Sequence, residues 1–107
     1  MQRNKHHRKT AEGIEWIRRI KEFGCIVCHR SGIHSPADAH HPKDKSTGRP
    51  VQDTEAIPLC PNHHSPNGVN GVAFHATGRK TWEAIYGTEQ ELLEETRRLI
   101  EEGRCRI

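Results

Sequence analysis

The hydrophobic and polar positions from residue 10 to residue 24 repeat with the period of an amphipathic helix. Apolar side chains recur there every three or four positions, with one additional aromatic residue alongside, at Ile14, Trp16, Ile17, Ile20 and Phe23. Residues with this spacing gather on one face of a helix. Thr10 is a residue type that caps helix N-termini, and Gly24 is one that ends helices. The pattern therefore predicts a helix that begins at Thr10 and runs to about Phe23, with its isoleucine side packed on a core.

The central part of the chain has a different pattern. It is mostly polar from Asp38 to Leu59, apart from the short apolar run AIPL, and contains the turn-forming KSTGRP at residues 45–50. This combination favours an irregular β-hairpin with its tip at residues 46–49. The following SPNGVNGVAFHATG, residues 65–78, is rich in glycine and asparagine and is typical of a loop.

Two more helices are predicted toward the C-terminus. The first covers residues 79–86 and stops at Gly87. TEQE, residues 88–91, matches the capping box S/T-x-x-E/Q and predicts a last helix over residues 89–102 that ends at Gly103. Helices on both sides of a hairpin indicate an α+β protein.

The composition limits how large a core the chain can form. It has 107 residues, of which 32% are hydrophobic and 5% aromatic. We expect one small domain over residues 10–107, and so thin a core usually needs a disulfide or a metal ion to stabilise it. Residues 1–9, MQRNKHHRK, show no periodicity and are expected to form a flexible basic arm.

Positive charge is concentrated in the first half of the chain. Residues 1–50 hold eleven Lys or Arg against five Asp or Glu, and the remaining residues hold six against nine. Basic residues gathered toward one end suit a polyanion such as DNA, although a solvated basic surface has the same composition. The candidates for phosphate contacts are Arg3, Lys5, Arg8 and Lys9 in the arm, and Arg79 and Lys80 at a predicted helix start.

The chain carries no membrane signal in its sequence. No apolar run is long enough to span a membrane, and the polar N-terminus lacks the apolar core of a signal peptide. We therefore expect a cytoplasmic protein with no membrane partner. Thiols stay reduced in that compartment, so paired cysteines are metal ligands more often than disulfides.

Two chelating pairs predict a structural zinc site. Cys25 and Cys28 form C-x-x-C, and Cys60 and His63 form C-x-x-H. Two such turns close a tetrahedral zinc site without an open position for chemistry, and zinc binding is then coupled to folding. The alternative interpretation is a set of buried thiols beside a surface histidine.

Two pairs of adjacent histidines predict a second site. His40 precedes His41 in DAHHPK, and His64 directly follows the predicted zinc ligand His63. Neighbouring side chains point in different directions, so the members of each pair serve different sites. We expect His40 and His64 to bind a divalent cation while His41 faces a water molecule as general base, a set suited to phosphodiester hydrolysis. A second structural zinc, or surface histidines on a hairpin, would use the same residues.

The order of these pairs resembles the HNH (ββα-metal) nucleases in their zinc-stapled, treble-clef form. The longer segments GCIVCHRSG, AHHPK, IPLCPNHH and GVNGVAFHATGRKTWEAIYGTEQELL are similar to the recombination enhancement, RecA-dependent nuclease family of phages and prophages, often called Ref. The similarity spans residues 14–100. It is most specific in the stretch G-x-x-F-H-x-x-G-R-K-x-W-E-x-x-Y-G.

The resemblance implies a small zinc-stapled HNH core that acts as a metal-dependent DNA endonuclease. By position it makes His40 and His64 ligands of Mg²⁺, Mn²⁺ or another divalent cation, and His41 the general base. His75 becomes a candidate third ligand, with a loop histidine or a phosphate contact as the alternatives. The resemblance also implies a phage or prophage protein in a bacterial host, with DNA and a RecA-type recombinase filament as partners.

Two questions stay open at this point. The middle asparagine of HNH enzymes has no single counterpart, because Asn62 lies inside the second chelating pair and Asp53 in the hairpin. The residue that orients His41 is therefore not identified. The rival interpretation is a non-catalytic, zinc-stapled DNA-binding module.

Overall fold

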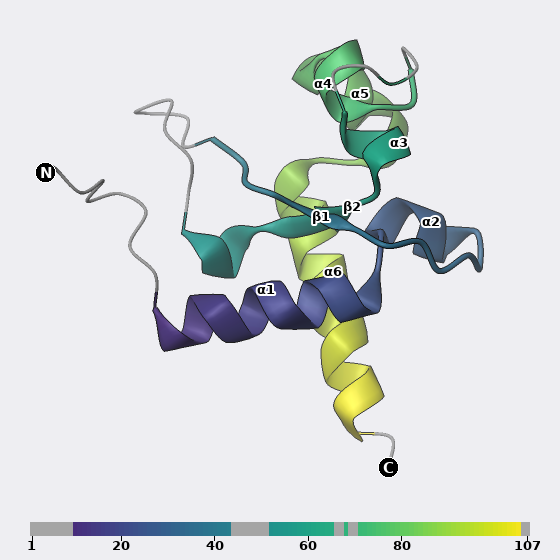
Figure 1. Ribbon diagram of the computed structural model, residues 1–107. Helices are drawn as coiled ribbons and strands as arrows, with labels where there is room; N and C mark the ends of the chain where they lie inside the picture. Colours follow the sequence, from purple (N-terminus) through teal and green to yellow (C-terminus); the bar gives the residue numbers. More distant parts are fainter. Residues whose placement is uncertain (1–9, 44–51, 66–67, 69–70, 106–107) are drawn as a thin grey trace, which may run out of the picture.

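The computed structural model describes residues 10–43, 52–65, 68 and 71–105, and the side chains of Arg104 and Cys105 are not described. Figure 1 shows short helices around a small antiparallel sheet, with the last helix running away from it. The elements in chain order are α1 (Ala11–Phe23), α2 (Ile26–Arg30), β1 (Asp38–His40), the 3-10 helix η1 (Asp53–Glu55), β2 (Ile57–Leu59), α3 (Pro61–His64), α4 (Phe74–Thr77), α5 (Arg79–Tyr86) and α6 (Glu89–Cys105). The predicted α+β class is confirmed.

The first helix, α1, begins and ends where its capping residues predict. The Thr10 side chain accepts a hydrogen bond from the Gly13 amide at 3.0 Å, and Gly24 ends the helix with a φ of 88°. The packed face is narrower than the isoleucine spacing predicts, because Ile20 is fully buried but Ile14 is 59% exposed. Ile14 lies in the first turn of α1 and is not part of the core.

The two strands confirm the arms of the predicted hairpin. β1 pairs antiparallel with β2 in the register Asp38 to Leu59, Ala39 to Pro58 and His40 to Ile57. The sheet packs against α1 and α6, which cross behind and below it in Figure 1. The predicted tip at residues 46–49 lies outside the described residues.

Two predicted boundaries are wrong. Residues 65–78 were expected to be a loop, but α4 lies within them because Phe74 is buried in the core. The last helix was expected to end at Gly103, but α6 continues to Cys105. Gly103 does not adopt the positive φ that ends α1 at Gly24, and a glycine that keeps helical angles weakens a helix without ending it.

The core lies where the sheet meets α2, α5 and α6. Its buried residues are Cys25, Ile26, Val27, Ile57, Leu59, Cys60, Phe74, Trp82, Leu92 and Leu93. Trp82 is fully buried, and its indole N–H donates to the Val72 carbonyl at 2.8 Å, so its polar atom is satisfied. Within the described part of the chain, no helix combines the length and apolarity needed to cross a membrane.

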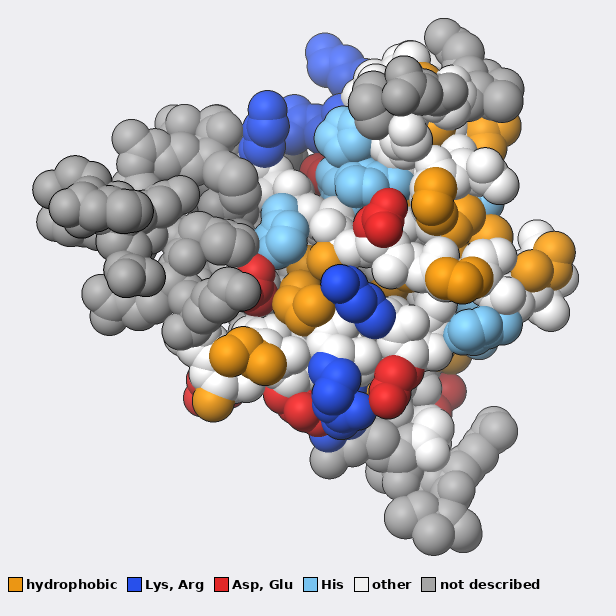
Figure 2. All heavy atoms as spheres, viewed as in Figure 1, with side chains coloured by type: hydrophobic (Ala, Val, Ile, Leu, Met, Phe, Trp, Pro, Cys, Tyr) orange, Lys and Arg blue, Asp and Glu red, His pale blue; other side chains and the backbone are white. Residues whose placement is uncertain are grey.

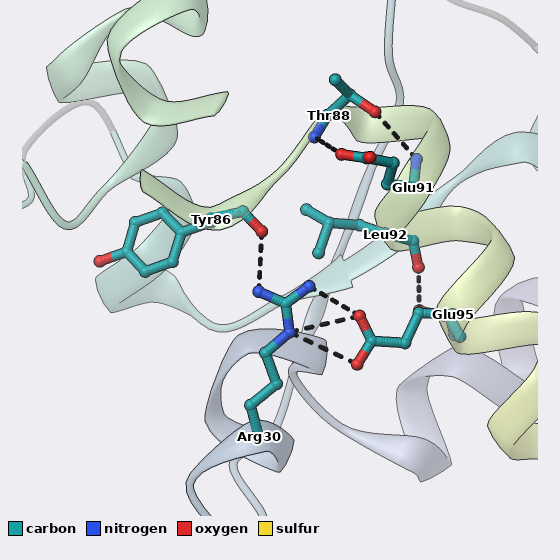
Figure 3. A network of polar contacts seen from close by, with 7 residues as sticks. Arg30, Tyr86, Thr88, Glu91, Leu92 and Glu95 are labelled. Atoms are coloured by element: carbon teal, nitrogen blue, oxygen red, sulfur yellow. Dashed lines mark hydrogen bonds and ion pairs between the residues drawn. The ribbon is translucent and has the colours of Figure 1, made fainter. Parts of the chain in front are cut away.

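A polar network joins α2 to the junction of α5 and α6 (Figure 3). The Arg30 guanidinium donates to the Tyr86 carbonyl at 2.7 Å and to the Glu95 carboxylate at 2.7 Å. The predicted capping box is present, since the Thr88 amide donates to Glu91 at 2.8 Å and the Glu91 amide to Thr88 at 3.0 Å. These contacts fix the start of α6 relative to the first chelating pair.

Candidate metal centres and active site

The two chelating pairs meet in one cluster that can hold a metal ion. Cys25, Cys28, Cys60 and His63 each offer one donor atom, and all four atoms lie within 4.8 Å of one another. The three sulfur atoms lie 3.2–3.6 Å from His63 Nδ1, and the Sγ atoms of Cys28 and Cys60 are 3.7 Å apart. Ligands about 2.3 Å from a tetrahedral zinc ion are about 3.8 Å from each other, so this spacing fits zinc.

Each pair sits at the start of a short helix. Cys25 is the N-cap of α2 and Cys28 lies one turn on, while Cys60 is the N-cap of α3 and precedes His63 in the same way. Burial, followed by the proximity of the other thiols, raises the pKa of Cys25 to about 12. A bound cation would deprotonate such a thiol, and three sulfur donors with one imidazole are a donor set that zinc prefers.

The structure brings three histidines into a second cluster. His40 at the end of β1, His64 at the end of α3 and His75 in α4 offer donor atoms within 4.8 Å of one another. Their ring centroids are 4.7–5.4 Å apart. His40 is buried, His64 is half-buried and His75 is exposed, so the cluster opens to solvent on one side. Figure 2 shows histidine side chains gathered on this face, with Lys and Arg side chains beside them.

The environment of this cluster favours neutral imidazoles. Burial lowers the pKa of His64, and the neighbouring His40 and His75 lower it further. Burial also lowers the pKa of His75, with further contributions from His40 and Lys43. Neutral imidazole is the form that binds a metal ion, so the lowered pKa values of His64 and His75 favour these two rings as ligands.

His41 and His40 contact different carboxylates. His41 Nε2 lies 2.7 Å from Asp53 Oδ1, and the Asp53 side chain is 10% exposed. His40 Nε2 lies 2.7 Å from Glu89 Oε2 on α6. The adjacent histidines therefore point to different places, as their neighbouring positions in the chain predict, and each contacts a buried carboxylate.

Sequence reasoning identified one of these two carboxylates as a candidate and missed the other. Asp53 was considered for orienting His41, and η1 brings it into contact with that ring. Glu89 was read only as the first residue of a helix, because no motif links it to a histidine 49 residues earlier. Asn62, the other candidate for orienting His41, lies exposed in α3.

An aromatic series connects the two clusters. The Phe74 ring lies 4.5 Å from the His40 ring, and the Trp82 ring lies 5.2 Å from Phe74. Tyr86 then packs at 4.7 Å against Trp82 and at 5.8 Å against His63. This accounts structurally for the specific F-H-x-x-G-R-K-x-W-E-x-x-Y stretch, whose aromatic residues support both sets of histidines.

The candidates for phosphate contacts are only partly within the described residues. Arg79 and Lys80 are exposed in the first turn of α5, directly after the helix that carries His75. Lys43 is also exposed, and its charge acts on His75. The remaining candidates, Arg3, Lys5, Arg8 and Lys9, lie outside the described residues.

A comparison with known protein families gives a match over most of the chain. A family model described as recombination enhancement, RecA-dependent nuclease matches residues 9–101. The matched range contains both clusters, both carboxylate partners and the aromatic series. Among curated proteins, none matches the chain.

Proposed function

The chain belongs to the recombination enhancement, RecA-dependent nuclease family, and on that premise we propose that it is a metal-dependent DNA endonuclease of the HNH type. The observation that carries the proposal is the pair His40 and His41. One ring belongs to a three-histidine cluster, and the next one is held by Asp53 at 2.7 Å. A cation ligand followed at once by an oriented base is the arrangement that HNH hydrolysis of a phosphodiester requires.

Two chelating knuckles around an antiparallel hairpin support a treble-clef form of the HNH fold. Cys25, Cys28, Cys60 and His63 would hold a structural zinc, and His63 and His64 lie side by side at the junction of the two clusters. A cation held by His40, His64 and His75 supplies Lewis-acid stabilisation of the phosphate and of the leaving 3′ oxygen. An all-imidazole donor set favours borderline ions such as Mn²⁺ or Zn²⁺ over Mg²⁺, which prefers oxygen ligands.

His41 would act as the general base. The Asp53 carboxylate would accept a hydrogen bond from His41 Nε2, so that Nδ1 carries the lone pair that would take a proton from the attacking water. Asp53 also stabilises the imidazolium that forms when the proton arrives. A buried carboxylate is suited to this role because its charge is poorly screened by solvent.

DNA would approach the open side of the three-histidine cluster. Lys43, Arg79 and Lys80 are exposed near this side and would neutralise backbone phosphates without reading bases. The family description makes a RecA-type recombinase filament the expected partner in cutting. We therefore propose weak intrinsic sequence preference, with the target chosen by the filament.

The proposal is tested by cutting of a supercoiled plasmid in Mn²⁺ or Mg²⁺, with and without a recombinase filament on a complementary single strand. Wild type is expected to cut, and His41→Ala to remain folded, bind DNA and lose cutting by about 100-fold or more. His34→Ala is the matched control, because His34 is an exposed histidine outside both clusters, and its Nε2 lies 3.0 Å from the Glu22 carbonyl oxygen. That variant is expected to cut as wild type does.

Three results would contradict the proposal or part of it. Equal cutting by wild type and His41→Ala would remove His41 as the base. Cutting by neither protein with any cation, with the filament present, would overturn the nuclease assignment. DNA binding without any cutting would favour the rival function, a zinc-stapled DNA-binding module.

A further inference from the structure

The carboxylate of Glu89 has no role in the chemistry described so far, although it contacts a residue of the cation cluster. We propose that Glu89 is a positioning residue that fixes the ring of His40 for cation binding, an inference that rests on the proposed function. Glu89 Oε2 lies 2.7 Å from His40 Nε2, and the two side chains are 11% and 4% exposed. The pair joins the end of β1 to the first residue of α6.

Helix capping does not explain why a carboxylate is buried at this position. The capping box at the start of α6 is formed by Thr88 and Glu91, which exchange hydrogen bonds of 2.8 and 3.0 Å. Glu89 lies between them and turns inward, to 9% exposure. Burying a carboxylate is costly unless it is hydrogen-bonded, and the contact with His40 compensates for that cost. The positive end of the α6 dipole favours the carboxylate further.

The contact selects one tautomer of His40. A carboxylate only accepts hydrogen bonds, so Nε2 must carry the hydrogen and the lone pair of Nδ1 is left for a cation. Phe74 packs against the same ring at 4.5 Å and limits its rotation. A carboxylate behind a ligating imidazole both orients the ring and makes it a stronger ligand.

Glu89 is placed behind the cluster and not within it. Among the described residues, the donor atoms that lie within 4.8 Å of one another come from His40, His64 and His75, and Glu89 is not in that set. Its direct contact is with His40, and its charge also acts on His75. The corresponding contact of His64, with Asp38 at 3.6 Å, is longer and more exposed, so Glu89 is the stronger of the two supports.

The test measures Mn²⁺ binding to protein that carries one zinc ion per chain, by the electron paramagnetic resonance signal of free Mn²⁺ and without DNA. Glu89→Gln keeps the size of the side chain and removes the charge. We expect Mn²⁺ affinity to fall about 10- to 100-fold, the range typical of lost outer-shell partners. Glu91→Gln is the matched control, because it weakens the same helix start without touching His40. It is expected to leave the affinity unchanged.

Two further measurements separate positioning from ligation and from folding. In the His40→Ala background, Glu89→Gln is expected to have no additional effect on Mn²⁺ affinity. In the wild type, ¹⁵N resonances of the His40 ring are expected to show a hydrogen on Nε2 and none on Nδ1 before Mn²⁺ is added. This second readout does not depend on the folding of any variant at position 89.

Some outcomes of these experiments would overturn the role of Glu89 alone, and another would overturn the cation site itself. Unchanged Mn²⁺ affinity in Glu89→Gln, an equal loss in Glu91→Gln, a further loss in the His40→Ala background, or a hydrogen on Nδ1 of His40 would each overturn the role of Glu89. A wild type that binds no Mn²⁺ beyond its zinc would instead overturn the cation site itself and both proposals with it. Plasmid cutting is not used here, so failure of the nuclease assignment cannot be mistaken for failure of this inference.

Discussion

His63 and His64 are adjacent, yet the same substitution at the two positions should have opposite consequences. His63 is one of four donors in the Cys25, Cys28, Cys60 cluster, with its Nδ1 3.2–3.6 Å from the three sulfur atoms. His64 belongs to the other cluster, and its side chain is 21% exposed. We predict that His63→Ala loses zinc and unfolds, whereas His64→Ala keeps its zinc and fold but loses cutting.

The size of the first effect follows from the zinc site. Outer-shell partners cost about 10- to 100-fold in metal affinity, so we take the loss of a direct ligand as about 1,000-fold. At about 1.4 kcal/mol for each factor of ten, this removes about 4 kcal/mol of zinc-linked stability. Small domains have about 5–15 kcal/mol in total. With a shift of about 4–8 °C for each kcal/mol, Tm should fall by about 15 °C or more.

The second effect is smaller because His64 is not one of the buried residues of the core. Its half-buried ring contacts His40 and His75 and lies 3.6 Å from the exposed Asp38 carboxylate, so its removal leaves the core packing in place. We expect His64→Ala to change stability by about 1 kcal/mol at most, a Tm shift within about 8 °C.

Thermal melts followed by circular dichroism, zinc content after gel filtration and plasmid cutting together test the contrast. The reasoning is refuted if His64→Ala loses zinc and melts as early as His63→Ala. It is equally refuted if His63→Ala keeps one zinc per chain and melts within about 8 °C of the wild type. In either case the assignment of the two histidines to separate sites would be wrong.

Three other substitutions test the supporting contacts. Gly13→Ala should lower the free energy of unfolding in urea titrations by about 1 kcal/mol, because the added methyl group would lie 2.9 Å from Asp53 Cβ. Alanine normally favours helices, so a more stable variant would contradict this prediction. Asp53→Asn should slow cutting about 10- to 100-fold and alter the pH profile of cutting, because it removes the charge behind His41. DNA affinity should change little, and an unchanged pH profile would exclude the orienting role of Asp53. Arg30→Ala should lower the free energy of unfolding by about 1–2 kcal/mol, because its bonds to Glu95 are part-exposed. The zinc content should stay unchanged, and zinc loss would show that this network also holds the Cys25 and Cys28 pair.

The sequence was sufficient for most features that depend on neighbouring residues. Thr10 and Gly24 determined the ends of α1, and the TEQE capping box determined the start of α6, because caps act within one helical turn. The chelating pairs were recognisable for the same reason, since each lies within one turn at the start of a short helix.

Other features depended on packing between distant segments. The four-residue α4 is too short to be stable alone and forms because Phe74 is buried, so its glycine-rich surroundings indicated only a loop. Ile14 had the spacing of a core residue, but the described residues leave its side chain 59% exposed. Gly103 had the identity of a helix end, but its backbone stays outside the positive-φ region.

The carboxylate partners of His40 and His41 show most clearly which features follow from local sequence and which require packing. That His40 and His41 point to different places follows from their neighbouring positions in the chain, at and just after the end of β1. Which carboxylate each ring meets does not, because Asp53 and Glu89 lie 12 and 49 residues further along the chain. Only the packing of η1 against α1 and of α6 against β2 brings these carboxylates to the two imidazoles, because no local rule of sequence acts over such separations.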